Sequence, residues 1–280
     1  MIHLIHLFTT NSGFSEATVF AISLVICWNI ETIAGLATGY RKWKHALVNS
    51  HFILTGILPQ LAVGYLFVRT MHWTYVHHFG LTWHMHISKN PLSLFLVTFV
   101  LLDLGEYVYH VIMHRVNSLW FFHAVHHSDH YVDVSTTLRE HPGENLIRNC
   151  FTLVWVLLSG AVFWTFFLRQ LIQIISNIFV HMHYRLPGRF DRVLGTVFIT
   201  PNIHQVHHHF ERPYTDCNYG DVLSVWDHLF GTFRMLPGEQ IVFGVDIMMD
   251  QRINSRYLPL MKFPFTRQKP RKMPERHVYH

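Results

Sequence analysis

The chain has 280 residues, of which 50% are hydrophobic and only 14% are Asp, Glu, Lys or Arg, and its mean hydropathy is +0.20. This balance excludes an ordinary water-soluble globular domain. The net charge of +5 is spread over short loops beside apolar segments, so anionic lipid is a better partner than nucleic acid. The three cysteines, Cys27, Cys150 and Cys217, have no paired spacing, which excludes a disulfide framework or a zinc ribbon.

The first two apolar segments are residues 17–39 and 46–68. Each is long enough to cross about 30 Å of hydrocarbon as a helix, and the first carries a single charge, Glu31, while the second carries none. The first ten residues lack the basic region and the cleavage site of a signal peptide, so we expect the first span to remain in the mature protein.

The next segment, residues 72–86, combines five histidines with tryptophan and tyrosine. We interpret it as an interfacial belt at the membrane face opposite the other histidines. A third apolar run begins after Pro91 and continues without a turn signal into Asp103 and His110, which predicts one long helix that leaves the bilayer.

The fourth apolar region, residues 151–180, is interrupted at Ser159 and Gly160 and carries one charge, Arg169. It is long enough for one overlong span or for two shorter helices. We predict a hairpin that enters the membrane and returns, because only then do the histidine motifs before and after it lie on the same face. The basic segments then fall on that face as well, which predicts that it is cytoplasmic. Their residues are Arg41, Lys42, Lys44, Arg115, Arg139, Arg148, Arg267, Lys269, Arg271, Lys272 and Arg276.

Histidine motifs are the main chemical signal. Of the 280 residues 25 are histidine, and at that frequency a random chain would contain about 0.2 matches to H-x-x-H-H. This chain contains two, with an H-x-x-x-H pair just upstream of the first. At this spacing each group can face one point if its segment is helical, which provides enough nitrogen for two metal ions. The histidines are His110 and His114; His123, His126 and His127; and His204, His207 and His208.

The pattern indicates a metal centre but leaves the metal open, because neutral imidazole binds zinc, copper, iron and nickel. The metalloprotease pattern H-E-x-x-H is absent, and a structural zinc site needs only four ligands. So many nitrogens beside a membrane favour a two-metal centre for oxygen chemistry on a lipid, with iron as the occupant. Soluble di-iron bundles use Glu-x-x-His pairs, which this chain lacks, so its centre would be rich in histidine.

Two polar residues precede the first pair on the same helical stripe. Asp103, Tyr107, His110 and His114 are spaced 4, 3 and 4 residues apart. An aspartate beside hydrocarbon needs a partner, so we predict that Asp103 accepts a hydrogen bond from a metal-binding imidazole, with Tyr107 close by. The alternative is an interfacial aspartate whose carboxylate simply reaches water.

Six segments together resemble the fatty acid hydroxylase/sterol desaturase superfamily in order and spacing. Within it they look most like the branch with bacterial sterol desaturase-like proteins and alkylglycerol monooxygenase. The segments are D-L-G-E-Y-V-Y-H-V-I-M-H at 103–114, W-F-F-H-A-V-H-H-S at 120–128, T-T-L-R-E-H-P at 136–142, H-M-H-Y-R-L-P at 181–187, T-P-N-I-H-Q-V-H-H at 200–208 and D-C-N-Y-G-D-V-L-S-V-W-D-H-L-F-G-T at 216–232.

The resemblance implies a membrane-bound, non-haem di-iron oxygenase that uses O2 and two electrons to hydroxylate or desaturate a lipid. It implies the eight histidines as iron ligands, and His181 as the ninth. Two positions depart from the usual pattern, Val111 and His183, and whether His183 adds a ligand or replaces a hydrogen bond stays open. Asp216 and Asn218 match the tail motif, where they would orient the last histidine cluster or have a purely structural role.

The sequence contains no recognisable reductase, ferredoxin or cytochrome domain, so an external electron donor of the cytochrome b5, ferredoxin or reductase type is expected. The expected membrane is the inner membrane in a bacterium or the endoplasmic reticulum in a eukaryote. We predict an all-α integral membrane protein with about four membrane-embedded helical segments and a cytoplasmic helical cap that carries the two-metal site. Its parts would be transmembrane helices and an interfacial loop at 1–91, a catalytic domain at 92–235 and a basic tail at 236–280.

Three alternatives remain at this stage. A histidine-box fatty acyl desaturase is disfavoured by the short gap from His114 to His123 and by the tail motif. A histidine-rich metal transporter would place its ligands in mid-membrane, whereas the first two apolar segments hold only Glu31 and His51 as ionisable residues. An inactive structural relative would keep the same residues, so the sequence does not separate it from an enzyme.

Overall fold

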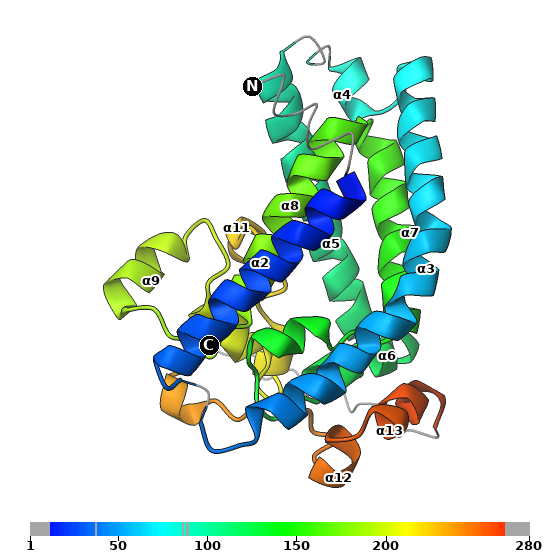
Figure 1. Ribbon diagram of the computed structural model, residues 1–280. Helices are drawn as coiled ribbons and strands as arrows, with labels where there is room; N and C mark the ends of the chain where they lie inside the picture. Colours follow the sequence, from blue (N-terminus) through cyan, green and yellow to red (C-terminus); the bar gives the residue numbers. More distant parts are fainter. Residues whose placement is uncertain (1–11, 37, 86, 88–89, 267–280) are drawn as a thin grey trace.

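A computed structural model describes residues 12–36, 38–85, 87 and 90–266 of the chain. Within these residues the protein consists of helices and loops, and strand-like pairing is limited to two isolated bridges, Phe198 with Leu223 and His209 with Phe243. The predicted all-α class is therefore confirmed. Long helices form an elongated bundle, and most of the shorter elements gather towards one end of it (Figure 1).

The elements follow one another along the chain with short connections. In order they are α2 (Ser12–Ile33), α3 (Lys42–His77), α4 (Leu81–His84), α5 (Pro91–Arg115), α6 (Asn117–His127), η2 (Val134–Leu138), α7 (Pro142–Ser159), α8 (Phe163–Val180), α9 (Gly188–Leu194), α10 (Pro201–His207), η3 (Tyr214–Asp216), α11 (Val225–Phe230), η4 (Gly238–Gln240), α12 (Gln251–Asn254), α13 (Tyr257–Lys262) and η5 (Phe263–Phe265).

Three helices, α2, α5 and α8, are long and apolar enough to cross a membrane. A fourth span is available if the bent pair Lys42–Leu61 and Val63–His84, whose axes differ by 41°, counts as one. Pro59 lies inside α3 just before this bend, where its ring removes one backbone donor from the helix. The predicted number of about four membrane-embedded segments agrees with this arrangement.

The chain reverses direction within residues 151–180, as the predicted hairpin requires, and of its two helices α8 is a candidate membrane span. Helix α7 ends at Ser159, the following Gly160 has a φ of +74° that suits glycine, and α8 begins at Phe163. A Cβ atom at Gly160 would also lie 2.6 Å from the carbonyl oxygen of Phe79, so the turn packs directly on the start of α4. Each helix has 18 residues and is therefore roughly 27 Å long, which is nearly the full hydrocarbon thickness rather than half of it.

This topology brings the histidine motifs to one end of the bundle. Helix α3 begins there, α5 and α8 end there, and α6 lies across that end, whereas α4 lies at the opposite end (Figure 1). The described part of the aromatic, histidine-containing segment 72–86 is therefore remote from the histidine motifs, as expected. The basic tail from Arg267 onwards and His86 lie outside the described residues.

Glu31, the single charge of the first span, ties α2 to this end of the bundle. Its side chain is fully buried, and Oε2 lies 2.9 Å from the ammonium nitrogen of Lys42 at the start of α3. Oε1 accepts hydrogen bonds from the backbone N–H groups of Val134, at 3.2 Å, and His183, at 2.6 Å. One carboxylate thus joins three segments that meet beside the histidine motifs.

We predict that Glu31→Gln lowers the free energy of unfolding by about 1–3 kcal/mol, because the ion pair with Lys42 is lost. Glu31→Leu should cost more, about 3–5 kcal/mol, since it also leaves two buried backbone donors without an acceptor. Denaturant unfolding in detergent micelles measures both changes. A leucine variant as stable as the unmodified protein would contradict this role of Glu31.

Candidate metal centre

Nine histidines converge in two adjacent groups, and within each group the candidate ligand atoms lie within 4.8 Å of one another. Helix α5, helix α6, the residue after α8 and the α10 segment supply them. These are the nine histidines that the sequence predicted as ligands. The larger group contains His110, His114, His123, His127 and His207, and the smaller one contains His126, His181, His204 and His208.

Each H-x-x-H-H motif contributes to both groups. In α6, His123 and His127 belong to the larger group, and His126 belongs to the smaller one. The second motif divides in the opposite sense, because its outer histidines join the smaller group and His207 joins the larger one. The groups therefore touch, and the rings of His127 and His208 stack with their centroids 4.6 Å apart.

Backbone carbonyl oxygens fix the orientation of four of the rings. A carbonyl oxygen only accepts, so the facing Nδ1 carries the proton and the lone pair of the imidazole is left on Nε2. The four contacts are His110 Nδ1 to Tyr219 O at 2.9 Å, His126 Nδ1 to Arg139 O at 3.3 Å, His181 Nδ1 to Asn177 O at 2.7 Å and His207 Nδ1 to Cys217 O at 2.6 Å.

Carboxylates fix two further rings in the same sense. Nδ1 of His123 lies 2.5 Å from Oε1 of Glu144, and Nδ1 of His114 lies 3.2 Å from Oδ1 of Asp216. The sequence had pointed to Asp216 but not to Glu144, which is fully buried in the first turn of α7. Burial alone would raise the pKa of Glu144, but His123 lowers it below its ordinary value.

The Nε2 atoms of neighbouring rings face one another at 3.0–3.2 Å. The Nε2 atoms of His110 and His123 are 3.0 Å apart. His126 and His181 both carry a proton on Nδ1, and their lowered pKa values keep both rings neutral, so no hydrogen lies between their Nε2 atoms, which are 3.2 Å apart. Two lone pairs directed at each other repel unless a cation lies between them. Nitrogens held about 2 Å from one ion would be about 3 Å apart, so this donor set fits a metal ion.

The electrostatics also favour the form of imidazole that binds metals. Burial lowers the pKa of His126, His204 and His208 well below the ordinary value, and neighbouring histidines lower it further. Burial also lowers the pKa of His181, to about 4. The rings are therefore neutral at physiological pH, as metal ligation requires.

Asp103 contacts the tail motif in place of a histidine. Its side chain is fully buried, and its two oxygens accept from the N–H groups of Val222 and Leu223, at 3.1 and 3.3 Å, and from Nε1 of Trp226, at 2.8 Å. Asp103 was predicted to accept a hydrogen bond from an imidazole, with a carboxylate that reaches water as the alternative. The contacts of its side chain agree with neither expectation. Asp103 anchors residues 222–226 to α5.

The other predicted polar residues also hold the tail motif. Tyr107 places its hydroxyl 3.0 Å from Oγ1 of Thr232. Nδ2 of Asn218 donates to the carbonyl oxygen of Ile203 in α10, at 3.0 Å, and its φ of +52° marks a tight turn. Residues 216–232 thus form a brace that orients both α10 and the carbonyls of the larger group. His183 lies outside both groups, with Nδ1 3.0 Å from the carbonyl oxygen of Val132.

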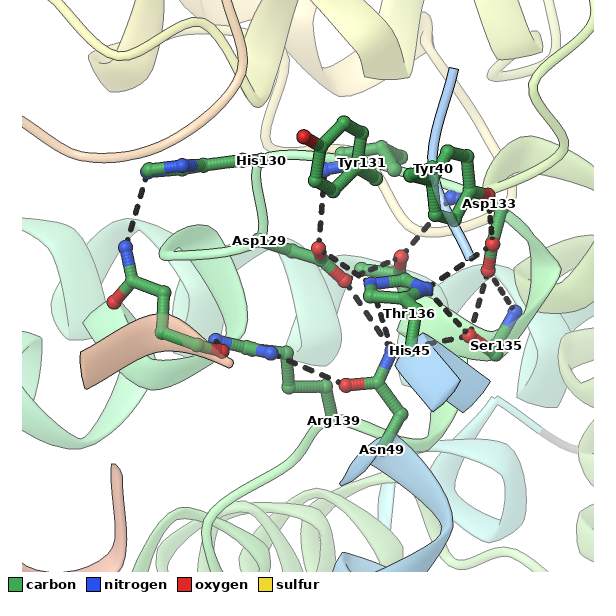
Figure 2. A network of polar contacts seen from close by, with 12 residues as sticks. Tyr40, His45, Asn49, Asp129, His130, Tyr131, Asp133, Ser135, Thr136 and Arg139 are labelled. Atoms are coloured by element: carbon green, nitrogen blue, oxygen red, sulfur yellow. Dashed lines mark hydrogen bonds and ion pairs between the residues drawn. The ribbon is translucent and has the colours of Figure 1, made fainter. Parts of the chain in front are cut away.

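A buried polar network supports residues 129–136, which follow the first H-x-x-H-H motif (Figure 2). Asp129 Oδ1 lies 2.7 Å from Nε2 of His45, and Asp129 Oδ2 accepts from Oγ1 of Thr136 at 2.8 Å and from Nδ2 of Asn49 at 3.3 Å. Asp133 contacts the other ring nitrogen of His45 at 3.2 Å. Both nitrogens of His45 therefore face carboxylates and both must donate, so this ring is a cation that joins α3 to residues 129–136.

Arg139 connects the same network to the histidines. Its side chain is 1% exposed, and it donates to the carbonyl of Val125 in α6 at 2.9 Å, to Oγ of Ser128 at 2.7 Å and to Oδ1 of Asn49 at 3.2 Å. Its own carbonyl oxygen faces His126, as described above. The sequence did not reveal a function for the segment T-T-L-R-E-H-P. In the structure, the side chain and the backbone carbonyl of Arg139 in this segment both help to position the candidate ligand His126.

The chain matches the fatty acid hydroxylase family over residues 95–232, a range that contains all nine histidines. It is 28% identical to alkylglycerol monooxygenase of Danio rerio over 205 residues, which cover 67% of this chain and 40% of that protein. It is also 28% identical to an ornithine lipid hydroxylase of Rhizobium tropici (78% and 65% covered) and to human alkylglycerol monooxygenase (82% and 49%). The chain thus spans between 40% and 65% of the length of these relatives. No solved structure matches it.

We predict that Glu144→Gln lowers metal affinity about 10- to 100-fold, because the carboxylate that holds His123 loses its charge. Competition with a chelator, followed by metal analysis, measures the change. Glu239→Gln, in η4 and outside both groups, is the control and should bind metal with unchanged affinity. Equal affinities of the Glu144 variant and the unmodified protein would contradict the assigned role.

We predict that Arg139→Met destabilises the protein by about 3–5 kcal/mol, because it leaves Asp129 without one of its two cationic neighbours and removes four buried donor contacts. Arg139→Lys keeps the charge but not the planar fork, so its loss should be smaller. Denaturant unfolding separates the two variants. Equal destabilisation by lysine and methionine would show that the charge of Arg139 contributes nothing.

Proposed function

The chain belongs to the fatty acid hydroxylase/sterol desaturase superfamily, and on this basis we propose that it is a membrane-bound di-iron oxygenase that hydroxylates a lipid. The observation that carries the proposal is the pair of adjacent imidazole groups, with their Nε2 lone pairs directed at common points. The relatives named above are lipid hydroxylases or monooxygenases by name, which supports a lipid as the substrate.

We assign the larger histidine group to one iron ion and the smaller group to the other. Iron is preferred over zinc because oxidation with O2 requires a metal that changes its oxidation state. When bound, the two ions supply the activation of O2 and the electron transfer to it. The overall reaction converts a C–H bond, O2, two electrons and two protons to an alcohol and water. The electrons come from an external one-electron carrier protein of the cytochrome b5, ferredoxin or reductase type.

The protein's own residues prepare this centre before substrate arrives. The carbonyl and carboxylate groups that face Nδ1 hold six of the nine rings in one orientation with a proton on Nδ1. The spans support the centre from the membrane side, so a lipid can approach without leaving an apolar environment. We place the centre on the cytoplasmic side, because Arg41, Lys42 and Lys44 lie at the same end of the bundle as the histidine motifs.

The alternatives fit the arrangement less well. A metal transporter needs ligands along a pathway through the membrane, whereas both histidine groups lie at one end of the bundle. Desaturation removes a second hydrogen from the same substrate at the same type of centre. Hydroxylation is preferred because the named relatives are hydroxylases and monooxygenases.

We expect the unmodified protein to bind two iron ions per chain. His126→Ala and His207→Ala, one variant in each group, should retain at most one ion and lose lipid oxidation by at least about 100-fold. Metal analysis of the purified protein and mass spectrometry of cellular lipids after growth under isotopically labelled O2 measure both effects. Membrane insertion should be unchanged, because neither ring lies within a candidate span.

His183→Ala is the matched control, since His183 is close to the centre but belongs to neither group. It should keep two ions and incorporate labelled oxygen. Full metal content and activity in His126→Ala or His207→Ala would refute the assignment, as would an unmodified protein that binds no iron.

A further inference from the structure

A cavity of about 640 Å³ lies between α2, α3, α5, α7 and α8. This volume is in the range of sites for small ligands. Five of its lining residues also line a smaller cavity whose wall includes His110, His123, His126, His181 and His204. The two cavities are therefore adjacent, and the large one reaches from the interior of the bundle to the residues that border the histidine groups. The shared residues are Glu106, Thr137, Glu140, Arg148 and Asn177.

The wall of this cavity changes from apolar to polar towards the histidines. Along α8, the lining residues recur every three or four positions and so form one helical face. The face begins with aromatic rings, continues with amides and ends one turn before a candidate ligand. In chain order its residues are Phe163, Phe166, Phe167, Gln170, Gln173, Ile174 and Asn177, and His181 follows.

The opposing helices have the same polarity. In α3 the apolar lining includes Phe67, which stacks on Phe166 with centroids 5.2 Å apart. In α7, whose first residues lie at the histidine end, the lining residues are polar and include Asn145, Asn149 and Thr152. The cavity thus combines an apolar end inside the bundle with a polar end at the metal centre.

The polar end offers hydrogen bonds but no unpaired cation among the described lining residues. Arg148, the one cation in the lining, lies 3.5 Å from Glu140 and 3.8 Å from Glu144. Arg169, just behind the lining, lies 3.0 Å from Asp221 and also binds the amide oxygens of Gln170 and Gln173. The amide –NH2 groups of both glutamines therefore remain as donors.

We propose that this cavity binds an amphiphile whose uncharged, hydroxyl- or amide-bearing headgroup faces the histidines and whose hydrocarbon chain extends between α3 and α8. Amide donors and carboxylate acceptors match a headgroup that both donates and accepts hydrogen bonds. An anionic headgroup finds no free cation, and a headless hydrocarbon leaves the polar groups without partners. On the basis of the proposed function, this orientation places oxidation at a carbon close to the headgroup and not at the far end of the chain.

Binding in lipid nanodiscs tests the headgroup without requiring catalysis. The assay measures how well each lipid displaces tritiated monopalmitoylglycerol. We expect monopalmitoylglycerol and N-palmitoylethanolamine to bind with at least about 10-fold higher affinity than hexadecyl phosphate, hexadecylamine or hexadecane, which corresponds to about 1.4 kcal/mol. Equal affinity for hexadecane, or a preference for either charged probe, would overturn the proposal. Because no metal, O2 or electron donor is needed, failure here is distinct from failure to oxidise lipids.

Matched variants at the two ends of the cavity sharpen the test. Asn149→Leu and Gln170→Leu should weaken binding of the uncharged probes several-fold and leave hexadecane unchanged, whereas Phe166→Ala should weaken all probes alike. Glu140→Gln removes a partner of Arg148, so it should increase the affinity for hexadecyl phosphate. This gain is measurable even if a leucine variant does not fold, and its absence in folded Glu140→Gln would count against the proposal.

Cross-linking tests the orientation directly. A monopalmitoylglycerol with a photoreactive diazirine beside the headgroup should label peptides that contain residues 145–152 or 170–177. The same lipid with the diazirine at the chain end should label peptides with residues 64–71 or 163–167. The reverse pattern would overturn the proposed orientation even if the uncharged headgroup is preferred.

Discussion

The repulsion between converging imidazole lone pairs is the constraint on which the rest of this structure depends. An Nδ1 anchor on a neutral ring directs the lone pair of Nε2 towards the neighbouring ring, as at His126 and His181, where the two Nε2 atoms are 3.2 Å apart. The anchors come from separate parts of the chain: the tail brace, the end of α8, the first turn of α7 and Arg139. Folding of these parts therefore assembles a site whose converging lone pairs a bound cation would stabilise.

Charge balance leads to the same conclusion. Neutral imidazoles do not compensate two divalent cations, yet the centre is surrounded by more carboxylates than arginines. Burial raises the pKa of Asp221 to about 7 and raises that of Glu140, although Arg169 and Arg148 lie beside them and act in the opposite direction. Bound metal ions would lower both pKa values again. The acidic residues are thus better explained as counter-charges of a metal centre than as isolated ion pairs.

The sequence predicted which histidines converge better than it predicted the residues that support them, for a physical reason. Ligands repeat at helical spacing within short segments, so His123 and His127 share a face whatever surrounds them. The hairpin followed from the same motifs, since no other topology brings both to one side. The supports depend on long-range packing: Glu144 lies 21 residues from His123, and Asp103 lies 119 residues from Val222. No local pattern distinguishes these carboxylates from other acidic residues, and Asp103 was accordingly expected beside an imidazole.

The membrane bundle and the metal-binding end form one unit, because the charges buried in the spans bind groups outside them. Glu31 of α2 accepts from the backbone beside the histidine motifs, and Arg169 of α8 pairs with Asp221 of the tail brace. A charge in a span is costly unless it is paired. These contacts therefore fix the positions of α2 and α8 relative to the segments that their charged residues bind. Helix α8 extends this coupling, since the face that lines the cavity leads directly to His181. A shift of one residue in its register would rotate that face by about 100° and displace the cavity wall and the candidate ligand His181 together.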